Sequence, residues 1–320
     1  MASSPPDVLI VGAGVIGLTT GLRLAERGWQ VRIRAEQWGR ETSSAAAGAI
    51  FDPTYATHPR VPQWSGQTYD EFARLAKDGH PAVRMVEGVE AARASVPPPD
   101  WAGHLPGFRL CTQSELPRGF VSGWRFTAPI VDMPSYLRWL EHELRAAGSE
   151  LLPGRLQTIE DGFADADIVV NCSGIGAREL VPDPEMQPVR GQLVAVRNPG
   201  IREFFGVYAD ELGDMTYFLP QGDVLLLGGN AEEGEQEPAP DRRVAAEIIR
   251  RCSEIFPAIA GAEVLEHRTG IRPLRREIRL EHTDLGDRHI VHNYGHSGAG
   301  VSLSWGCADD VAELVQRLRG

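Results

Sequence analysis

The start of the chain carries the pattern that most restricts its fold: an apolar run, a glycine-rich turn and a helix-like stretch in direct succession. Val8–Val11 is the apolar run, and the sequence GAGVIG follows it at Gly12–Gly17. Gly12 permits a tight turn, Gly14 lets the backbone approach a pyrophosphate, and Gly17 lets the helix pack closely on the strand. The N-terminus of such a helix presents N–H groups and a positive dipole end to phosphates. The pattern predicts a Rossmann-type βαβ unit that binds a dinucleotide.

The residues after this turn complete the βαβ unit. Val31–Ala35 alternates as a second strand, and Glu36 ends it at the distance expected for a carboxylate that binds a ribose hydroxyl. Small residues fill Thr42–Gly48, where they would let the backbone pass beside a wide flat ring; taken alone, they fit a flexible loop equally well. The glycine pattern itself does not distinguish FAD from NAD.

The same strand, glycine turn and helix return at the C-terminal end of the chain, in His289–Asn293, Gly295–Gly300 and Val301–Leu318. The segment from about 52 to 131 is rich in Pro, Trp and Tyr and predicts loops and edge strands. Further helices are expected at Ser135–Ala147 and Asp241–Phe256, and further strands at Asp167–Cys172, Val264–Arg268 and Arg279–Glu281.

These patterns predict a mixed α/β fold, with a Rossmann-type lobe assembled from discontinuous pieces and a β-rich substrate-binding lobe inserted between them. The expected cofactor lobe comprises residues 1–51, 145–190 and 282–320. The expected substrate-binding lobe comprises residues 52–144 and 191–281.

Composition disfavours several classes of function. With 44 acidic against 32 basic residues, the formal net charge is −12, which disfavours binding to nucleic acid or to an anionic membrane. No window approaches twenty apolar residues, and we find neither a secretory signal nor a peroxisomal C-terminal signal. The four cysteines lack metal-binding or redox spacing, so we expect free thiols in a cytoplasmic protein without a metal.

Taken together, the motifs resemble those of the D-amino-acid oxidase family nearly end to end. The resemblance rests on DVLIVGAGVIGLTTGLRL, AAGAI, DIVVNCSG, RGQLVAV and YFLP, and above all on HRTGIRPLRREIRLE at His267–Glu281 and HNYGHSGAGVSLSWGCA at His292–Ala308. It implies FAD held noncovalently, and we expect Cys307 to pack in its helix rather than to link the flavin. A small D-amino acid and O₂ would be the substrates, and we also expect a homodimer.

The resemblance also implies which residues contact the cofactor. They come from the first glycine turn, the end of the second strand, the small-residue run, two mid-chain segments, the motif at 270–273 and the C-terminal glycine turn. The expected cofactor-binding residues are Gly12, Ala13, Gly14, Val15, Ile16, Gly17, Glu36, Gln37, Thr42, Ser43, Ala47, Gly48, Ala49, Leu156, Cys172, Ser173, Gly174, Arg272, Ser297, Gly298, Ala299, Gly300, Val301 and Ser302.

Three residues are expected to act on the substrate. Arg272 matches the family's arginine that binds the substrate carboxylate through two parallel hydrogen bonds. Tyr217 matches the tyrosine that supports the same carboxylate, and a backbone carbonyl near Gly298 would accept a hydrogen bond from the substrate amine. A second tyrosine of mammalian-type members is absent, because Gly213 stands at its place; Tyr208 is a candidate replacement from another loop position.

The implied activity is FAD-dependent oxidative deamination of neutral D-amino acids to 2-oxo acids, with release of ammonia and H₂O₂ and hydride transfer from Cα to flavin N5. Related flavin amine oxidases, acting on D-aspartate, glycine or sarcosine, are the alternative. A D-aspartate enzyme needs a further cation, whereas Val207–Tyr217 contains three acids (Asp210, Glu211 and Asp214) and no Arg or Lys. A non-catalytic FAD protein and an NAD dehydrogenase also remain open at this level.

Overall fold

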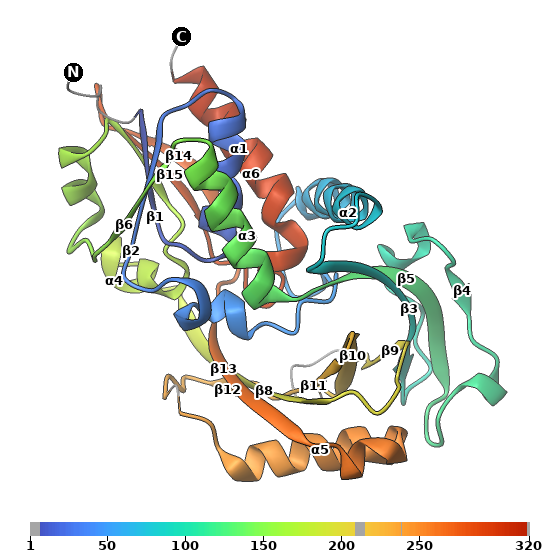
Figure 1. The fold of residues 1–320 in the computed structure, drawn as a ribbon. Helices are drawn as coiled ribbons and strands as arrows, with labels where there is room; N and C mark the ends of the chain where they lie inside the picture. Colours follow the sequence, from blue (N-terminus) through green and yellow to red (C-terminus); the bar gives the residue numbers. More distant parts are fainter. Residues whose placement is uncertain (1–6, 209–214, 238, 319–320) are drawn as a thin grey trace.

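Two β-sheets with helices packed on them make up the described part of the chain, residues 7–208, 215–237 and 239–318 of the computed structural model (Figure 1). The first sheet contains, in spatial order, β14 (Arg279–Asp284), β15 (His289–Tyr294), β7 (Ile168–Asn171), β1 (Val8–Val11), β2 (Val31–Ala35) and β6 (Glu150–Pro153). Its neighbouring strands are parallel except β14, which runs antiparallel to β15. Every side chain of β1 is buried, as its unbroken apolar run predicts.

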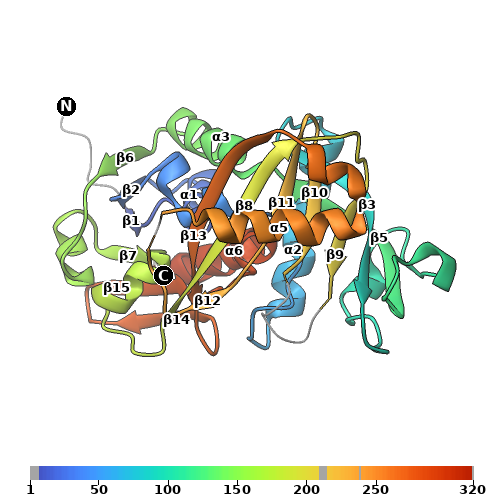
Figure 2. The same cartoon turned by 90° about the horizontal axis from the view of Figure 1, so that it is seen from below.

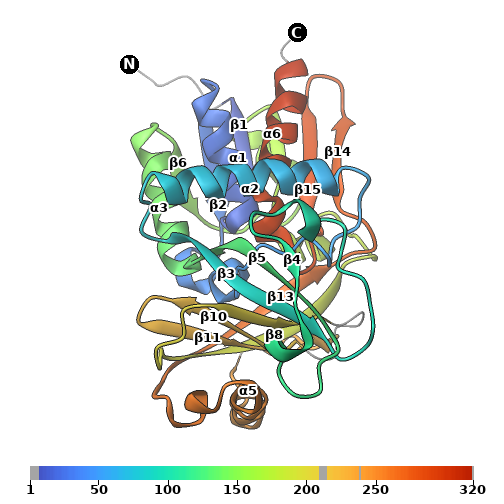
Figure 3. The ribbon, with the colours of Figure 1, turned by 90° about the vertical axis from the view of Figure 1, so that its right-hand side faces the viewer.

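Helices from distant parts of the chain pack together on the first sheet. They are α1 (Val15–Glu26), α3 (Met133–Ala146) and α6 (Gly300–Arg317). α2 (Val61–Lys77) crosses α6 so closely that a Cβ built on Gly306 would lie 2.3 Å from Trp64 Cα. Because α2 also contacts β3 and β5 of the second sheet, it bridges the two layers (Figure 3).

The second sheet is mainly antiparallel. In spatial order it contains β12 (Glu232–Glu233), β8 (Gln187–Arg197), β11 (Val224–Gly228), β10 (Tyr217–Gln221), β9 (Phe204–Val207), β3 (Val83–Ala92), β5 (Ser122–Val131) and β4 (Arg109–Leu110), and β13 (Val264–Leu274) also pairs with β8. α5 (Arg242–Ile255) packs on β8 and β11 on the side of the sheet away from the first layer (Figures 1 and 2). The Asp241 side chain caps α5 by accepting from the Arg243 N–H at 2.7 Å.

The expected mixed α/β fold is confirmed, but the region from 52 to 131 differs from its expected loops and edge strands. It contains α2 and two long strands, β3 and β5, which pair over ten residues each. β13 also continues past its expected end at Arg268, because its backbone stays paired with β8 as far as Leu274. Arg272 therefore lies on a strand whose neighbours fix its position.

The chain crosses between the two sheets four times, as the expected lobe boundaries imply, but at somewhat different residues. α3 packs on α1, so residues 133–144 lie with the first sheet, although the expected division assigns them to the β-rich lobe. β8 enters the second sheet at Gln187, and β14 enters the first at Arg279. Between β7 and β8 the described chain forms only one 3-10 turn (Gly174–Gly176) and the short helix α4 (Ala177–Leu180). The assignment of cofactor and substrate binding to separate lobes stays a proposal.

Candidate active site

A cavity of about 860 Å³ is lined by residues of both sheets, at the upper end of the size range of small-molecule sites. The expected cofactor residues that line it are Gly12, Ala13, Gly14, Val15, Ile16, Glu36, Gln37, Thr42, Ser43, Ala47, Gly48, Ala49, Leu156, Cys172, Ser173, Gly174, Arg272, Ser297, Gly298, Gly300 and Val301. Tyr217 lines it as well. The fold therefore brings both glycine turns and the expected substrate residues to one space.

The glycine turn between β1 and α1 forms one end of this cavity. Gly12 has a φ of +113°, a left-handed conformation that suits glycine, and a Cβ there would lie 2.4 Å from the Cys172 carbonyl oxygen. Gly14 caps α1 without a side chain, and the Val15 N–H donates to Ser44 Oγ at 3.0 Å. A phosphate can therefore approach the backbone closely at the positive end of the helix.

The N-terminus of α6 opens onto the same cavity. Its cap residue, Ala299, makes no side-chain cap hydrogen bond, and Ser297 has a φ of +52° in the turn just before it. Gly298 and Gly300 line the cavity beside this turn. Two helix N-termini at one cavity fit an anionic dinucleotide such as FAD: the α1 end suits its pyrophosphate, and the α6 end suits the electronegative edge of its flavin ring.

Gly17, Ala299 and Ser302 are expected cofactor residues that do not line the cavity among the residues described. A Cβ on Gly17 would lie 2.0 Å from the Gly12 carbonyl oxygen, so glycine is required there for α1 to pack on the turn. Ala299 is buried at the α6 cap, and Ser302 Oγ accepts from the Asp52 N–H at 2.8 Å. These three residues pack behind residues that line the cavity.

The end of β2 and the buried cysteines complete the cofactor side. Glu36 lines the cavity and lies 3.8 Å from Arg155 in an exposed ion pair. Burial raises the pKa of Cys172, which lines the cavity, to about 12, so this thiol stays protonated. Cys307 is fully buried in α6. Within the described ranges, no cluster of residues could hold a metal ion and no helix is long and apolar enough to cross a membrane.

Arg272 extends from β13 into the other end of the cavity. A Cβ on Gly191, on the paired strand β8, would lie 2.4 Å from Arg272 Nη1, so glycine there leaves room for the guanidinium. Nη1 donates to the Asn230 carbonyl oxygen at 3.0 Å, and no carboxylate of the described residues pairs with the group. Burial lowers the pKa of Arg272, yet a guanidinium stays charged. It is a buried cation with donors left for an anionic ligand.

Two tyrosines lie beside this guanidinium. Glycine makes room for the Tyr217 ring, because a Cβ on Gly228 would lie 1.9 Å from Tyr217 Cζ. Burial raises the pKa of Tyr217 to about 12, and the charge of Arg272 opposes this rise. Tyr55 packs against Gly298. Burial raises the pKa of Tyr55, and the charge of Arg272 opposes this rise too. Tyr55 lies in none of the motifs in the sequence, and its one available signal is its place after the small-residue run.

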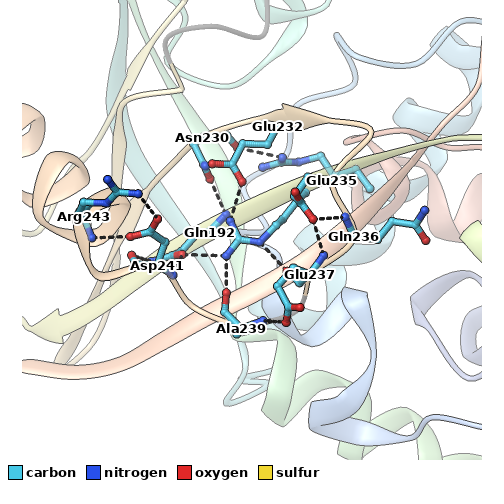
Figure 4. Close-up of polar contacts among 11 residues, drawn as sticks. Gln192, Asn230, Glu232, Glu235, Gln236, Glu237, Ala239, Asp241 and Arg243 are labelled. Atoms are coloured by element: carbon cyan, nitrogen blue, oxygen red, sulfur yellow. Dashed lines mark hydrogen bonds and ion pairs between the residues drawn. The ribbon is translucent and has the colours of Figure 1, made fainter.

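A polar network around Gln192 fixes Asn230, whose carbonyl oxygen accepts from Arg272 (Figure 4). The Asn230 side-chain oxygen accepts from the Gln192 N–H at 2.7 Å. Gln192 in turn donates to the Asp241 carbonyl oxygen and accepts from the Asp241 N–H, each at 2.8 Å, while the buried Arg190 donates to Gln192 Oε1 at 3.2 Å. The Arg-Gly-Gln motif on β8 therefore serves to order the loop before α5 and, through it, the Arg272 side chain.

Two carboxyl groups that no sequence motif indicates, those of Asp52 and Glu90, also line the cavity. Burial raises the pKa of Asp52, and it raises the pKa of Glu90 to about 8, with the nearby Asp52 adding to the effect. Both residues are partly exposed. Trp124 donates to Glu90 Oε2 at 2.9 Å.

The segment expected to form an active-site lid falls largely outside the described residues. Asp210, Glu211, Gly213 and Asp214 all lie there. Tyr208, the suggested replacement for the second tyrosine, packs edge-on against Trp124 with 5.3 Å between ring centroids, and it does not line the described cavity. Among the described residues, Tyr55 is the additional tyrosine that lies beside Arg272.

Comparisons with known proteins agree with this geometry. A D-amino-acid oxidase of Rubrobacter xylanophilus is 46% identical over 311 residues, which cover 96% of this chain and 95% of that protein. A human D-aspartate oxidase is 34% identical over 96% of this chain and 94% of its own length. The crystal structure of glycine oxidase from Geobacillus kaustophilus has the same fold, with a TM-score of 0.84 at 22% identity, covering 98% of this chain and 95% of that one. The sequence model of the family described as FAD dependent oxidoreductase matches residues 7–314, and the chain belongs to that family.

Proposed function

We propose that this FAD-dependent enzyme oxidatively deaminates neutral D-amino acids to 2-oxo acids, releasing ammonia and H₂O₂. The observation that carries the proposal is the buried guanidinium of Arg272, which pairs with no carboxylate of the described residues and lies in the same cavity as two helix N-termini. The name of the 46% identical bacterial relative, D-amino-acid oxidase, supports it independently. FAD, when bound, accepts the hydride from the substrate Cα and passes the electrons to O₂.

The protein's part in this reaction is to bind and orient the substrate. Arg272 would bind the carboxylate through two parallel N–H donors, and the hydroxyls of Tyr217 and Tyr55 would each donate a further hydrogen bond. The backbone carbonyl of Gly298 would accept from the amine, which sets the direction of the Cα–H bond. His296 lines the cavity, but burial lowers its pKa to about 3 and keeps it neutral. The residues fit hydride transfer from a neutral amine, which needs no side-chain base.

The alternative activity, D-aspartate oxidation, needs a second cation for the side-chain carboxylate. The arginines of the described cavity wall are Arg34, Arg155, Arg178 and Arg272, and the first three lie on the cofactor side with Glu36 and Glu179. Of these four described arginines, only Arg272 lies beside Tyr217 and Tyr55. This distribution supports a preference for uncharged over acidic side chains. A homodimer and a cytoplasmic location also stay proposals.

A substrate panel tests the proposed function. D-Valine and D-alanine should bleach the flavin absorbance without O₂, and L-alanine should leave it unchanged. The kcat/KM for D-valine should exceed that for D-aspartate at least about tenfold, because a second carboxylate would be buried near Asp52 and Glu90 without a cation. A higher kcat/KM for D-aspartate would show that the alternative activity is correct. Absence of bleaching by every D-amino acid would refute the proposed function altogether.

The two tyrosines should each contribute modestly to substrate binding. Tyr217→Phe and Tyr55→Phe are each expected to lower kcat/KM by up to about tenfold, because one neutral hydrogen bond contributes about 0.5–1.5 kcal/mol. Steady-state kinetics with D-valine measure this, and Tyr69→Phe is a matched control whose hydroxyl binds the Thr127 carbonyl oxygen away from the cavity. If Tyr55→Phe behaves as the control does, Tyr217 acts alone.

A further inference from the structure

One buried carboxyl group joins segments of the two sheets. Asp183 is 6% exposed and belongs to the connection between α4 and β8. Its Oδ2 accepts from the Tyr294 hydroxyl at 2.8 Å and from Arg275 Nε at 3.0 Å, and its Oδ1 accepts from the Glu185 N–H at 2.9 Å. A buried carboxylate needs such partners, because removing a charge from water is costly. Asp183 is not among the described residues that line the cavity, so it can influence the site only through its partners.

The two side-chain donors come from segments that form the cavity. Tyr294 ends β15, lines the cavity itself and directly precedes the glycine turn before α6. Arg275 follows the end of β13, the strand that carries Arg272. Its side chain covers Gly295, where a Cβ would lie 2.8 Å from Arg275 Cδ and where φ is +83°. Asp183 therefore connects the strand of Arg272 to the turn that leads into α6.

Further hydrogen bonds give this connection a defined direction. The Ser297 N–H, in the turn before α6, donates to the Pro273 carbonyl oxygen at 3.1 Å. Arg279 Nη1 donates to the Tyr294 hydroxyl oxygen at 2.8 Å. Because a guanidinium can only donate, the Tyr294 oxygen accepts from Arg279 and its own proton is directed to Asp183. Each group in the network therefore has one favoured orientation.

Asp183 carries a charge at neutral pH although it is buried. Burial raises its pKa, but hydrogen bonds from Tyr294, from the Glu185 N–H and from Arg275 outweigh this effect and place the pKa below its ordinary value. Hydrogen bonds to an ionised group are stronger than those between neutral groups, and a buried site strengthens them further. The carboxylate can therefore hold both the turn and the end of the strand in place.

We propose that Asp183 is a positioning residue that fixes the turn before α6 relative to Arg272. It acts through Tyr294 and Arg275 and contacts neither substrate nor cofactor. The inference rests on the proposed function, in which Arg272 holds the substrate carboxylate and the N-terminus of α6 serves the flavin. The relative position of these two segments would then set how the substrate Cα approaches the hydride acceptor, and a misplacement of about 1 Å can cost about a hundredfold in rate.

Asp183→Asn tests this role, because it keeps the shape of the side chain and removes its charge. The purified variant should retain FAD, since the phosphate site at α1 is unchanged. Its kcat for D-valine should fall about tenfold or more, whereas KM should change less than about threefold, because Arg272 still binds the carboxylate but presents the substrate in the wrong place. Flavin absorbance and steady-state kinetics measure the two effects.

Tyr294→Phe supplies a measurement that needs no substrate. It removes the hydrogen bond to Asp183 without changing any charge, so the N-terminus of α6 should be placed less accurately and should stabilise negative charge on the flavin less well. The midpoint potential of the bound FAD, measured against a redox dye, should fall below the wild-type value. The double variant Asp183→Asn/Tyr294→Phe should have a kcat close to that of the more impaired single variant, because both changes break one network.

Asp310→Asn is the matched control for the loss of a buried carboxyl group. Asp310 is 5% exposed on α6, accepts from Trp64 Nε1 and from Arg60 Nη2, each at 2.7 Å, and is not among the residues that line the described cavity. This variant should have a lower melting temperature, because it weakens a buried charged hydrogen-bond network. Its flavin potential and its kinetics with D-valine should match those of wild type.

The inference is wrong if Asp183→Asn keeps the wild-type kcat and Tyr294→Phe the wild-type potential. It is also wrong if both variants change only the melting temperature, as Asp310→Asn should. If the wild-type enzyme oxidises no D-amino acid, the proposed function has failed, and the potential of Tyr294→Phe still decides the role of Asp183. Should Asp183→Asn not fold, the kcat and the potential of Tyr294→Phe decide the matter.

Discussion

Arg272→Ala should retain FAD yet lose more than about a hundredfold in kcat/KM for D-valine, because it removes a bidentate, charge-assisted pair in a buried site. The guanidinium has no carboxylate partner among the described residues, so its free donors are available to the substrate. Flavin content measured by absorbance and steady-state kinetics together test both halves of this expectation.

Two further arginine variants identify the group responsible. Arg272→Lys should retain only part of the activity, because an ammonium group cannot present two parallel, coplanar N–H donors to a carboxylate. Arg276→Ala is the matched control, since Arg276 is exposed just after β13 and does not line the cavity. If Arg272→Ala keeps wild-type kinetics, or Tyr217→Phe is the more damaging change, the carboxylate is bound elsewhere; Arg279, which is held by Glu281 and Tyr294, would be examined next.

Gly14→Val should yield a folded protein without FAD. Gly14 lines the cavity at the α1 cap with a φ of −73°, so a side chain causes no backbone strain there, but it would occupy the space that a phosphate needs. A Cβ at this position meets only the Ser44 side chain, at 3.0 Å. Far-ultraviolet circular dichroism should match wild type, while the flavin absorbance at purification should be lost.

The glycine chosen matters for this experiment. A Cβ at Gly12 or Gly17 would clash with backbone atoms. A variant at either position could therefore lose FAD because it is misfolded, and its flavin content would not report on the phosphate site. Gly66→Val is the matched control, because Gly66 lies on the exposed side of α2 with open space around it. Full flavin content in Gly14→Val would place the pyrophosphate elsewhere.

How much the sequence predicts depends on how local each signal is. The strand, turn and helix from Val8 to Glu26 are encoded within twenty consecutive residues, and the structure reproduces them. α2 is missed because the expected pattern in its region is dominated by Pro, Trp and Tyr, whereas the helix is stabilised by packing on α6 around Trp64. The end of β13 is missed because its last residues are held by pairing with β8, which no local pattern reports.

The residues of the candidate site can likewise be predicted only where the signal is local in the sequence. Arg272 and Tyr217 lie in motifs that resemble a known family, so they can be identified from the sequence. Tyr55 and Glu90 carry no such motif, and they face the cavity only because a loop and a strand distant in sequence meet there. Residues of this kind require the fold to be known, since their role depends on sheet register rather than on their neighbours in the chain.

The pairing of β15 with β7, and the place of α6 beside α1, have a consequence for how the protein matures. One wall of the cavity is formed by the glycine turn before α6 and the start of α6, which come later in the chain than the other residues that line the cavity. A nascent chain can form its first βαβ unit early, but the wall of the cavity is incomplete until the turn before α6 has been synthesised. We therefore expect FAD to stabilise by mass action only chains that extend through α6, whereas a chain that terminates before α6 would gain no such stabilisation.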